Sequence, residues 1–136
     1  MTTPTTPTRP RVLDAAALLA EARGETYVMA AINVVLRSGG ELIVPAGAIS
    51  AAIATRPAAE PRLLALIERD QVHVDNLTGA TARRVGRLLA RSKLPIELLP
   101  AAHVVHAATD RDRCPVFTGD PAILRQVDPN LTLDEI

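Results

Sequence analysis

The stretch PVFTGDPAIL, residues 115–124, begins as an apolar strand, turns at Thr118 and Gly119, and continues as an apolar helix. Asp120 suits the N-cap of that helix and Pro121 its first turn, a cap being worth about 1 kcal/mol. A carboxylate at such a junction has a second use, because parallel sheets bind ligands beyond the carboxyl ends of their strands. For Asp120 taken alone, base rates favour the cap.

Short apolar runs alternate with helical patterns along the rest of the chain. RVLD, residues 11–14, predicts a buried strand that ends at Asp14 and leads into an Ala/Leu-rich helix. Further strands are predicted at 41–44, 71–74, 114–117 and 131–133, and further helices at 25–37, 45–54, 61–70, 78–92, 101–112 and 120–127. This alternation predicts an α/β domain with a mostly parallel sheet. Asp14 and Asp120 then both stand at strand ends, which is the first indication of a functional site.

The composition describes one globular domain with an aliphatic core. Hydrophobic residues make up 48% of the 136 residues, and Tyr27 and Phe117 are the only aromatics, so base stacking is a poor binding mode for this chain. The 15 basic and 15 acidic residues leave a net charge of +0, so the whole protein has no bias toward nucleic acid or membranes. In the helix predicted at 25–37, an apolar stripe is formed by Tyr27, Ala31, Val34 and Val35.

Cysteine usage and the ends of the chain bear on its location. Cys114 is the lone cysteine, which excludes an intrachain disulfide and fits a reducing cytosol. No apolar run approaches the roughly 20 residues that span a bilayer. Residues 1–10, MTTPTTPTRP, lack the apolar segment of a secretory signal and are predicted to be a flexible extension of a single domain at 11–136. We therefore expect a cytoplasmic protein without a membrane partner.

The blocks RVLDAAALLA, IVPAGAISAAI, RRVGRLLARS, AAHVVHAA and VFTGDPAIL resemble, in this order, the successive blocks of PIN domains. That family includes VapC-like ribonuclease toxins of toxin–antitoxin pairs, and the resemblance runs from about Arg11 to the end of the chain. It implies a three-layer α/β/α sandwich around a small, mostly parallel sheet. It also implies an acidic Mg²⁺ or Mn²⁺ site, cleavage of single-stranded RNA, and frequent homodimers.

The match to the family's acidic residues is incomplete. Asp14 matches the first acid and Asp120 the late acid of the T-x-D block, so these two would be the catalytic acids and metal ligands. The glutamate of the helix after VPAG falls at Ala51, and the aspartate that opens DAHVV falls at Ala101. A divalent cation needs several anionic oxygens, and a methyl group supplies none. Two of the core carboxylates are thus missing.

We therefore expect a PIN-like protein with incomplete catalytic acids that acts by binding RNA or a protein partner, needs no cofactor and forms a homodimer. The alternative is a divergent Mg²⁺- or Mn²⁺-dependent single-strand endoribonuclease, the toxin of a toxin–antitoxin pair. That enzyme would use the two remaining acids and, as a substitute, Glu97, for which a solvated loop position is the commoner role. Ala122 and Ile123 stand where further acids of the family often follow.

Two other groups of residues are candidates for binding. Three arginines share one face of the helix predicted at 78–92, where they suit RNA phosphates or an acidic, antitoxin-like partner, although a solvated face is the commoner role. These are Arg84, Arg87 and Arg91. His103, His106 and Asp110 share another helix face, but no second cluster completes a metal site. His73 is expected to point outward from its strand, and Cys114 to be a buried, inert thiol.

Overall fold

The structure is a computed structural model that describes residues 9–136. The predicted flexible extension at 1–10 therefore lies outside the described residues except for its last two positions. Arg9, one of these, donates a hydrogen bond from its guanidinium to the backbone oxygen of Asp112 at 2.7 Å. Among the helices of residues 9–136, none is long and apolar enough to cross a membrane.

Five short parallel strands form the single sheet of the described chain, in the order β3-β2-β1-β4-β5. They are β1 (Arg11–Leu13), β2 (Leu42–Pro45), β3 (Val72–Asp75), β4 (Val116–Thr118) and β5 (Leu133–Glu135). Val12 is the central point of the register, since it pairs with Ile43 of β2 and with Val116 of β4. The prediction of a mostly parallel sheet is confirmed, and every strand pair proves to be parallel.

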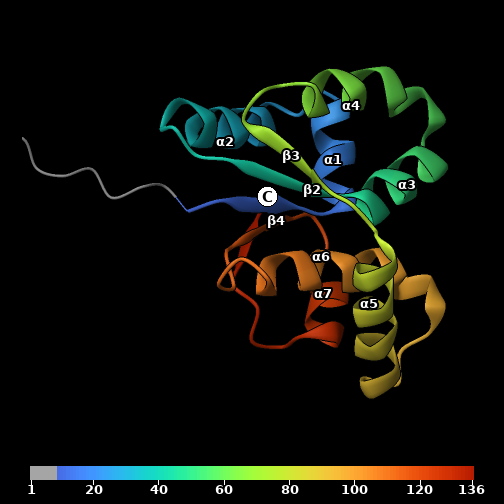
Figure 1. Ribbon diagram of the computed structural model, residues 1–136. Helices are drawn as coiled ribbons and strands as arrows, with labels where there is room; N and C mark the ends of the chain where they lie inside the picture. The colour runs from blue at the N-terminus through green and yellow to red at the C-terminus, as the bar shows by residue number, and fades with distance from the viewer. Residues whose placement is uncertain (1–8) are drawn as a thin grey trace, which may run out of the picture.

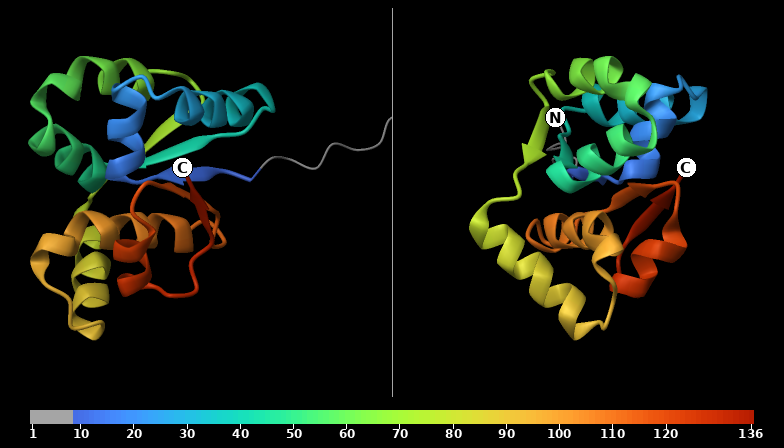
Figure 2. Two further views of the ribbon diagram at one scale, coloured as in Figure 1. Left: turned by 180° about the vertical axis from the view of Figure 1, so that it is seen from behind. Right: turned by 90° about the vertical axis from the view of Figure 1, so that its right-hand side faces the viewer.

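Helices cover both faces of the sheet, which confirms the three-layer α/β/α sandwich. Figures 1 and 2 show one layer above the strands and one below them. The first layer contains α1 (Ala15–Ala22), α2 (Thr26–Arg37), α3 (Ala46–Thr55) and α4 (Glu60–Ile67), and the second contains α5 (Gly79–Arg91), α6 (Leu99–Thr109) and α7 (Pro121–Val127). Two short 3₁₀ helices, η1 (Pro57–Ala59) and η2 (Ile96–Leu98), precede α4 and α6.

The strand order reverses direction between β1 and β4, and this reversal locates the site. From β1 the chain builds outward through β2 and β3, then crosses back and continues outward through β4 and β5 on the other side. In open parallel sheets, ligands bind at such a switch point, in the crevice beyond the carboxyl ends of the two strands. Asp14 directly follows β1, and Asp120 closely follows β4. The topology therefore brings the two acids to one crevice.

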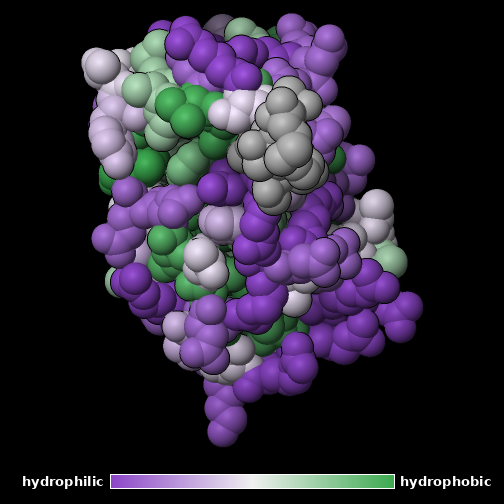
Figure 3. Space-filling model, turned by 90° about the vertical axis from the view of Figure 1, so that its left-hand side faces the viewer, coloured by the Kyte–Doolittle hydropathy of each residue, from purple (hydrophilic) through white to green (hydrophobic). Residues whose placement is uncertain are grey.

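The predicted apolar stripe of α2 is wrong in its details. Tyr27 is 68% exposed and Val34 is 64% exposed, so half of the predicted stripe faces outward. The helix instead buries Val28, Ile32, Val35 and Leu36. Both sets repeat at helical spacing, and the set that contains the larger aliphatic side chains packs inward. Apolar patches among hydrophilic residues are visible on one side of the molecule in Figure 3.

Candidate functional site

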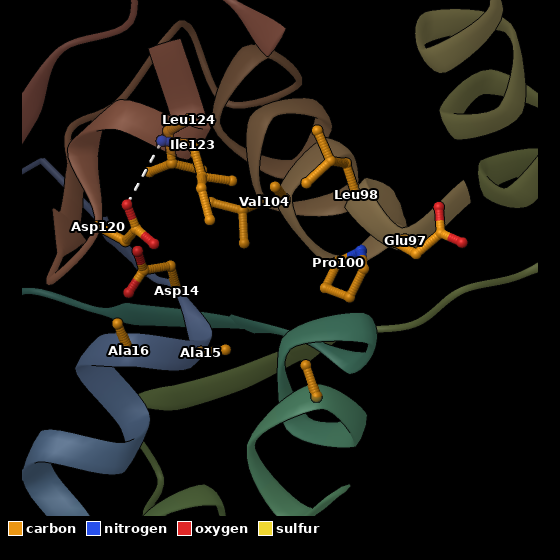
Figure 4. A pocket seen from close by; sticks show the side chains of 12 residues that line it. Asp14, Ala15, Ala16, Glu97, Leu98, Pro100, Val104, Asp120, Ile123 and Leu124 are labelled. Atoms are coloured by element: carbon orange, nitrogen blue, oxygen red, sulfur yellow. Dashed lines mark hydrogen bonds between the residues drawn. The ribbon is translucent and has the colours of Figure 1, made fainter. Parts of the chain in front are cut away.

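A pocket of about 200 Å³ lies beyond the carboxyl ends of β1 and β4. Its lining consists of Asp14, Ala15, Ala16, Ala51, Glu97, Leu98, Pro100, Ala101, Val104, Asp120, Ile123 and Leu124, most of which are labelled in Figure 4. The structure thus brings together both predicted acids, both alanines that stand in place of acids, and Glu97. The two acids are the N-caps of α1 and α7, the two alanines lie in α3 and α6, and Glu97 lies in η2.

Asp14 is the buried acid of this pocket, with only 6% of its surface exposed. Its Oδ1 accepts a hydrogen bond from the backbone N–H of Ala17 at 2.8 Å, so it caps α1. Its Oδ2 accepts a hydrogen bond from the Thr118 hydroxyl at 2.5 Å. Burial raises the pKa of the Asp14 carboxyl, these hydrogen bonds and one from Gly119 oppose the rise, and the charge of Asp120 adds to it.

Asp120 serves as the cap that its position before Pro121 predicts, and it also lines the pocket. Its Oδ1 accepts from the backbone N–H of Ile123 at 3.5 Å, and its own N–H donates to the Thr118 hydroxyl at 2.9 Å. Gly119 permits this approach, because a Cβ at that position would lie 2.9 Å from the Cβ of Ala16. The T-G-D sequence therefore places one hydroxyl between two acids, against the first turn of α1.

The opposite wall lacks acidic groups near this pair. Ala51 of α3 and Ala101 of α6 line the pocket with methyl groups. Glu97 is exposed on η2, and in Figure 4 its carboxylate lies on the far side of the pocket, turned away from Asp14 and Asp120.

The side chains of the pocket do not fit a Mg²⁺ or Mn²⁺ site. Hard cations take about six oxygen ligands, of which the protein usually supplies more than one carboxylate together with water or substrate oxygens. Throughout residues 9–136 there is no group of three or more His, Cys, Asp or Glu side chains placed to hold a metal ion. Asp14 and Asp120 remain a pair, and both already accept hydrogen bonds from helix N–H groups.

His103 belongs to a buried polar network that the sequence analysis missed. Its Nδ1 accepts from the backbone N–H of Gly47 at 3.1 Å, so its Nε2 donates to Asp75 at 2.9 Å. Arg111 donates to the other oxygen of Asp75 at 3.0 Å. Burial lowers the pKa of the His103 imidazole, and the hydrogen bond and charge of Asp75 oppose this effect. Asp75 stands at the carboxyl end of β3, much as Asp14 follows β1. This position at a strand end is the sequence signal that could have marked Asp75 as a candidate site residue.

This network removes His103 from the histidine metal site considered above. His103 is fully buried, whereas His106 is half-buried on another side of α6 and Asp110 is exposed at the end of that helix. The three side chains share a helix but not a site. His73 is exposed and lies 3.5 Å from Glu41, and Cys114 is fully buried, where burial raises the pKa of its thiol, as expected for an inert cysteine.

The three predicted arginines lie along a groove of about 600 Å³ between α5 and α6. Arg84, Arg87 and Arg91 line it with His106 and Thr109 of α6, and Arg113 and Asp128 lie at its other side. Arg113 and Asp128 form an ion pair at 3.1 Å. No ion pair of residues 9–136 involves the three α5 arginines, which leaves their charges uncompensated in the described chain.

Comparisons with known proteins support the fold. No protein-family model matches this chain, and no curated protein sequence matches it. A solved structure of VapBC2 from Rickettsia felis, bound to a DNA fragment from their promoter, contains a chain with a similar fold. The similarity has a TM-score of 0.64 and covers 93% of this chain and 98% of that chain, at 11% sequence identity. The chain described here therefore has a PIN-like fold, as its sequence blocks predict.

Proposed function

We propose that this PIN-like protein acts by binding rather than by metal-dependent cleavage of RNA. The observation that carries the proposal is the pair of alanines, Ala51 and Ala101, that line the pocket beside Asp14 and Asp120. Positioned metal ions supply the charge stabilisation that phosphodiester cleavage requires. Asp14 and Asp120 are flanked by these two methyl groups, and the third carboxylate of the lining, Glu97, is turned away from them, so the pocket lacks the clustered negative charge to retain such ions.

The proposed ligand is the phosphate backbone of single-stranded RNA, held in the groove along Arg84, Arg87 and Arg91. Three guanidiniums on one helix face suit a row of phosphates, and they have no ion-pair partner within residues 9–136. Because the chain has only one tyrosine and one phenylalanine, contacts to phosphate rather than base stacking would supply the affinity. Binding is therefore expected to be strongly salt-dependent and weakly sequence-dependent.

A triple substitution of these arginines to glutamine tests the RNA proposal. We expect weaker binding of a single-stranded RNA, and a slope of log affinity against log salt that is smaller by about 2, since each phosphate contact on a single strand contributes about 0.7. The matched control replaces three exposed arginines elsewhere, Arg37, Arg56 and Arg69, and causes the same change in net charge. Equal losses in both triple variants would show that the groove has no special role.

The second candidate is the divergent endoribonuclease. It is favoured by one observation, namely that Asp14 and Asp120 still share a pocket. An RNA cleavage assay with millimolar Mn²⁺ separates the two functions. Cleavage that Asp14→Asn abolishes would establish the enzyme and contradict our proposal, and its absence together with RNA binding would support the proposal.

A protein partner is the remaining part of the proposal. The similar chain comes from a VapBC complex, and this supports an antitoxin-like partner for the present protein. Tyr27 and Val34 of α2 are large apolar side chains in contact with solvent, and they line a shallow hollow with Phe117. We propose that this surface is buried in a complex, either with such a partner or in a homodimer. Light scattering of the isolated protein distinguishes a dimer from a monomer.

A further inference from the structure

The N-terminus of α3 is capped by a side chain from the opposite layer of helices. Pro45 occupies the N-cap position of α3 and makes no side-chain hydrogen bond to the first turn. The first N–H groups of a helix have no partner inside the helix, so another group must accept their hydrogen bonds. The backbone N–H of Gly47 donates to Nδ1 of His103 in α6 at 3.1 Å. His103 therefore replaces the cap that Pro45 cannot supply.

This cap requires a neutral imidazole. The Nε2 atom of His103 carries the proton that is donated to Asp75 at 2.9 Å, and the lone pair of Nδ1 accepts from Gly47. A proton taken up from solvent would occupy Nδ1, and the ring would then present a donor to the N–H of Gly47. A cation at this place also opposes the positive end of the α3 dipole. One proton therefore converts an attraction between α3 and α6 into a repulsion.

The surroundings of the ring favour its neutral form. Burial, the largest effect, lowers the pKa of the His103 imidazole, and the side chain has no exposed surface. Asp75 at the end of β3 opposes this effect, whereas His106 on the next turn of α6 and Arg111 beyond α6 add to it. Arg111 also donates to Asp75 at 3.0 Å. α3 itself contributes no ionisable side chain.

The contact between α3 and α6 is close, and it continues into the wall of the pocket beyond β1 and β4. A Cβ at Gly47 would lie 3.1 Å from Nδ1 of His103 and 3.5 Å from the Cα of Pro100. Ala51 lies one turn after Gly47 on the same face of α3 and lines the pocket. The buried residues of α3 are all small, namely Gly47, Ala48 and Ala52. Separation of this helix from α6 therefore exposes little apolar surface and moves one wall of the pocket.

We propose that His103 is a pH-dependent latch between α6 and α3, which opens the pocket under mildly acidic conditions. With a neutral ring, α3 is capped and Ala51 forms the pocket wall. With a protonated ring, the first turns of α3 separate from α6, while the sheet and the other helices stay folded. The latch does not depend on the proposed binding of RNA, whose three arginines lie on α5.

Native-state hydrogen exchange of the full chain, followed by NMR, tests the latch. Protection factors corrected for the intrinsic effect of pH on exchange are measured between about pH 8 and about pH 5. An ordinary imidazole with a pKa of 6.5 in the open state binds the proton more readily than the closed state does, so opening increases below that pH. We expect the protection of the α3 amides to fall several-fold, with about 30-fold as the limit that one proton sets at pH 5. The strands are expected to keep their protection.

His103→Gln separates the latch from other effects of acid. The glutamine side chain offers an amide oxygen to Gly47 and an amide NH₂ group to Asp75, but it takes up no proton in this range. The protection of α3 in this variant is expected to be the same at about pH 8 and about pH 5. His73→Gln is the matched control, because it removes an exposed imidazole of β3 and leaves the buried network intact. In this control, α3 is expected to open on acidification as in the native protein.

The results decide the proposal in either direction. Unchanged protection of α3 down to about pH 5, or an equal loss of protection in α3 and in the strands, overturns the latch. A native response of α3 in folded His103→Gln also overturns it. If the glutamine variant does not fold, His103→Asn takes its place with the same expected result, because its amide oxygen can still accept from Gly47. None of these results bears on the binding of RNA by the α5 arginines.

Discussion

The Thr118 hydroxyl holds the two acids of the pocket together, because it donates to Asp14 and accepts from the backbone N–H of Asp120. Thr118→Val keeps the shape of the side chain but leaves both partners without this contact in a buried setting. We expect unfolding experiments to show a loss of about 1–3 kcal/mol. Thr118→Ser retains the hydroxyl and is expected to lose less. A valine variant as stable as the native protein would mean that the hydroxyl contributes nothing to stability.

A second prediction at the residue scale concerns pH. The pKa of His103 in the folded protein lies below its ordinary value of 6.5, so the unfolded chain binds the proton more readily. This contribution to stability is complete above pH 6.5 and is lost as the pH falls through the folded-state pKa. His103→Gln is therefore expected to weaken the fall in stability on acidification, measured by denaturant titration from about pH 8 to about pH 5.

The matched control for His103 is His73→Gln, because His73 is exposed on β3. This variant also removes one imidazole from the chain but leaves the buried network intact. If His103→Gln shows the native pH dependence, the buried network with Gly47 and Asp75 is not the source of the acid sensitivity.

At the scale of elements, the contact between α1 and the turn after β4 depends on a glycine. A Cβ at Gly119 would lie 2.9 Å from the Cβ of Ala16, which requires one element to shift. We expect Gly119→Ala to cost about 1–3 kcal/mol of stability. The double variant with Ala16→Gly is expected to recover part of this loss beyond additivity, as a double-mutant cycle measures.

Gly86 provides the control for this prediction, because it lies within α5 and a Cβ there meets nothing within 4 Å. Gly86→Ala is expected to stabilise the protein by about 0.5–1 kcal/mol, since alanine is the better helix former. A similar gain from Gly119→Ala would contradict the close packing of the turn against α1.

At the scale of the whole molecule, the fold still brings to the pocket two positions at which added carboxylates would complete a metal site. Ala51 and Ala101 reach the pocket from opposite layers of helices. The double variant Ala51→Glu with Ala101→Asp is expected to bind Mn²⁺ at least about tenfold more tightly than the native chain, because affinity for hard cations rises with the number of carboxylate ligands. Titration calorimetry with Mn²⁺ measures the change.

Ala54→Glu adds one acid on the exposed side of α3 and serves as the control, which is expected not to gain Mn²⁺ affinity. Unchanged affinity in the folded double variant would show that the two positions do not face a common site. It would remove the main support for the view that missing carboxylates explain the proposed loss of cleavage.

By itself, the sequence determined the alternation of strands and helices, the acids at two strand ends and the alanines at two expected acid positions. These features can be read from the sequence because apolar runs, helix caps and the order of sequence blocks are local patterns. Only the tertiary structure decided which apolar face of α2 is buried, that His103 pairs with Asp75 and Gly47, and that the α5 arginines share a groove with α6. Each of these depends on residues far apart in the chain. Local periodicity is compatible with either face of a helix, and packing against the sheet selects one of them.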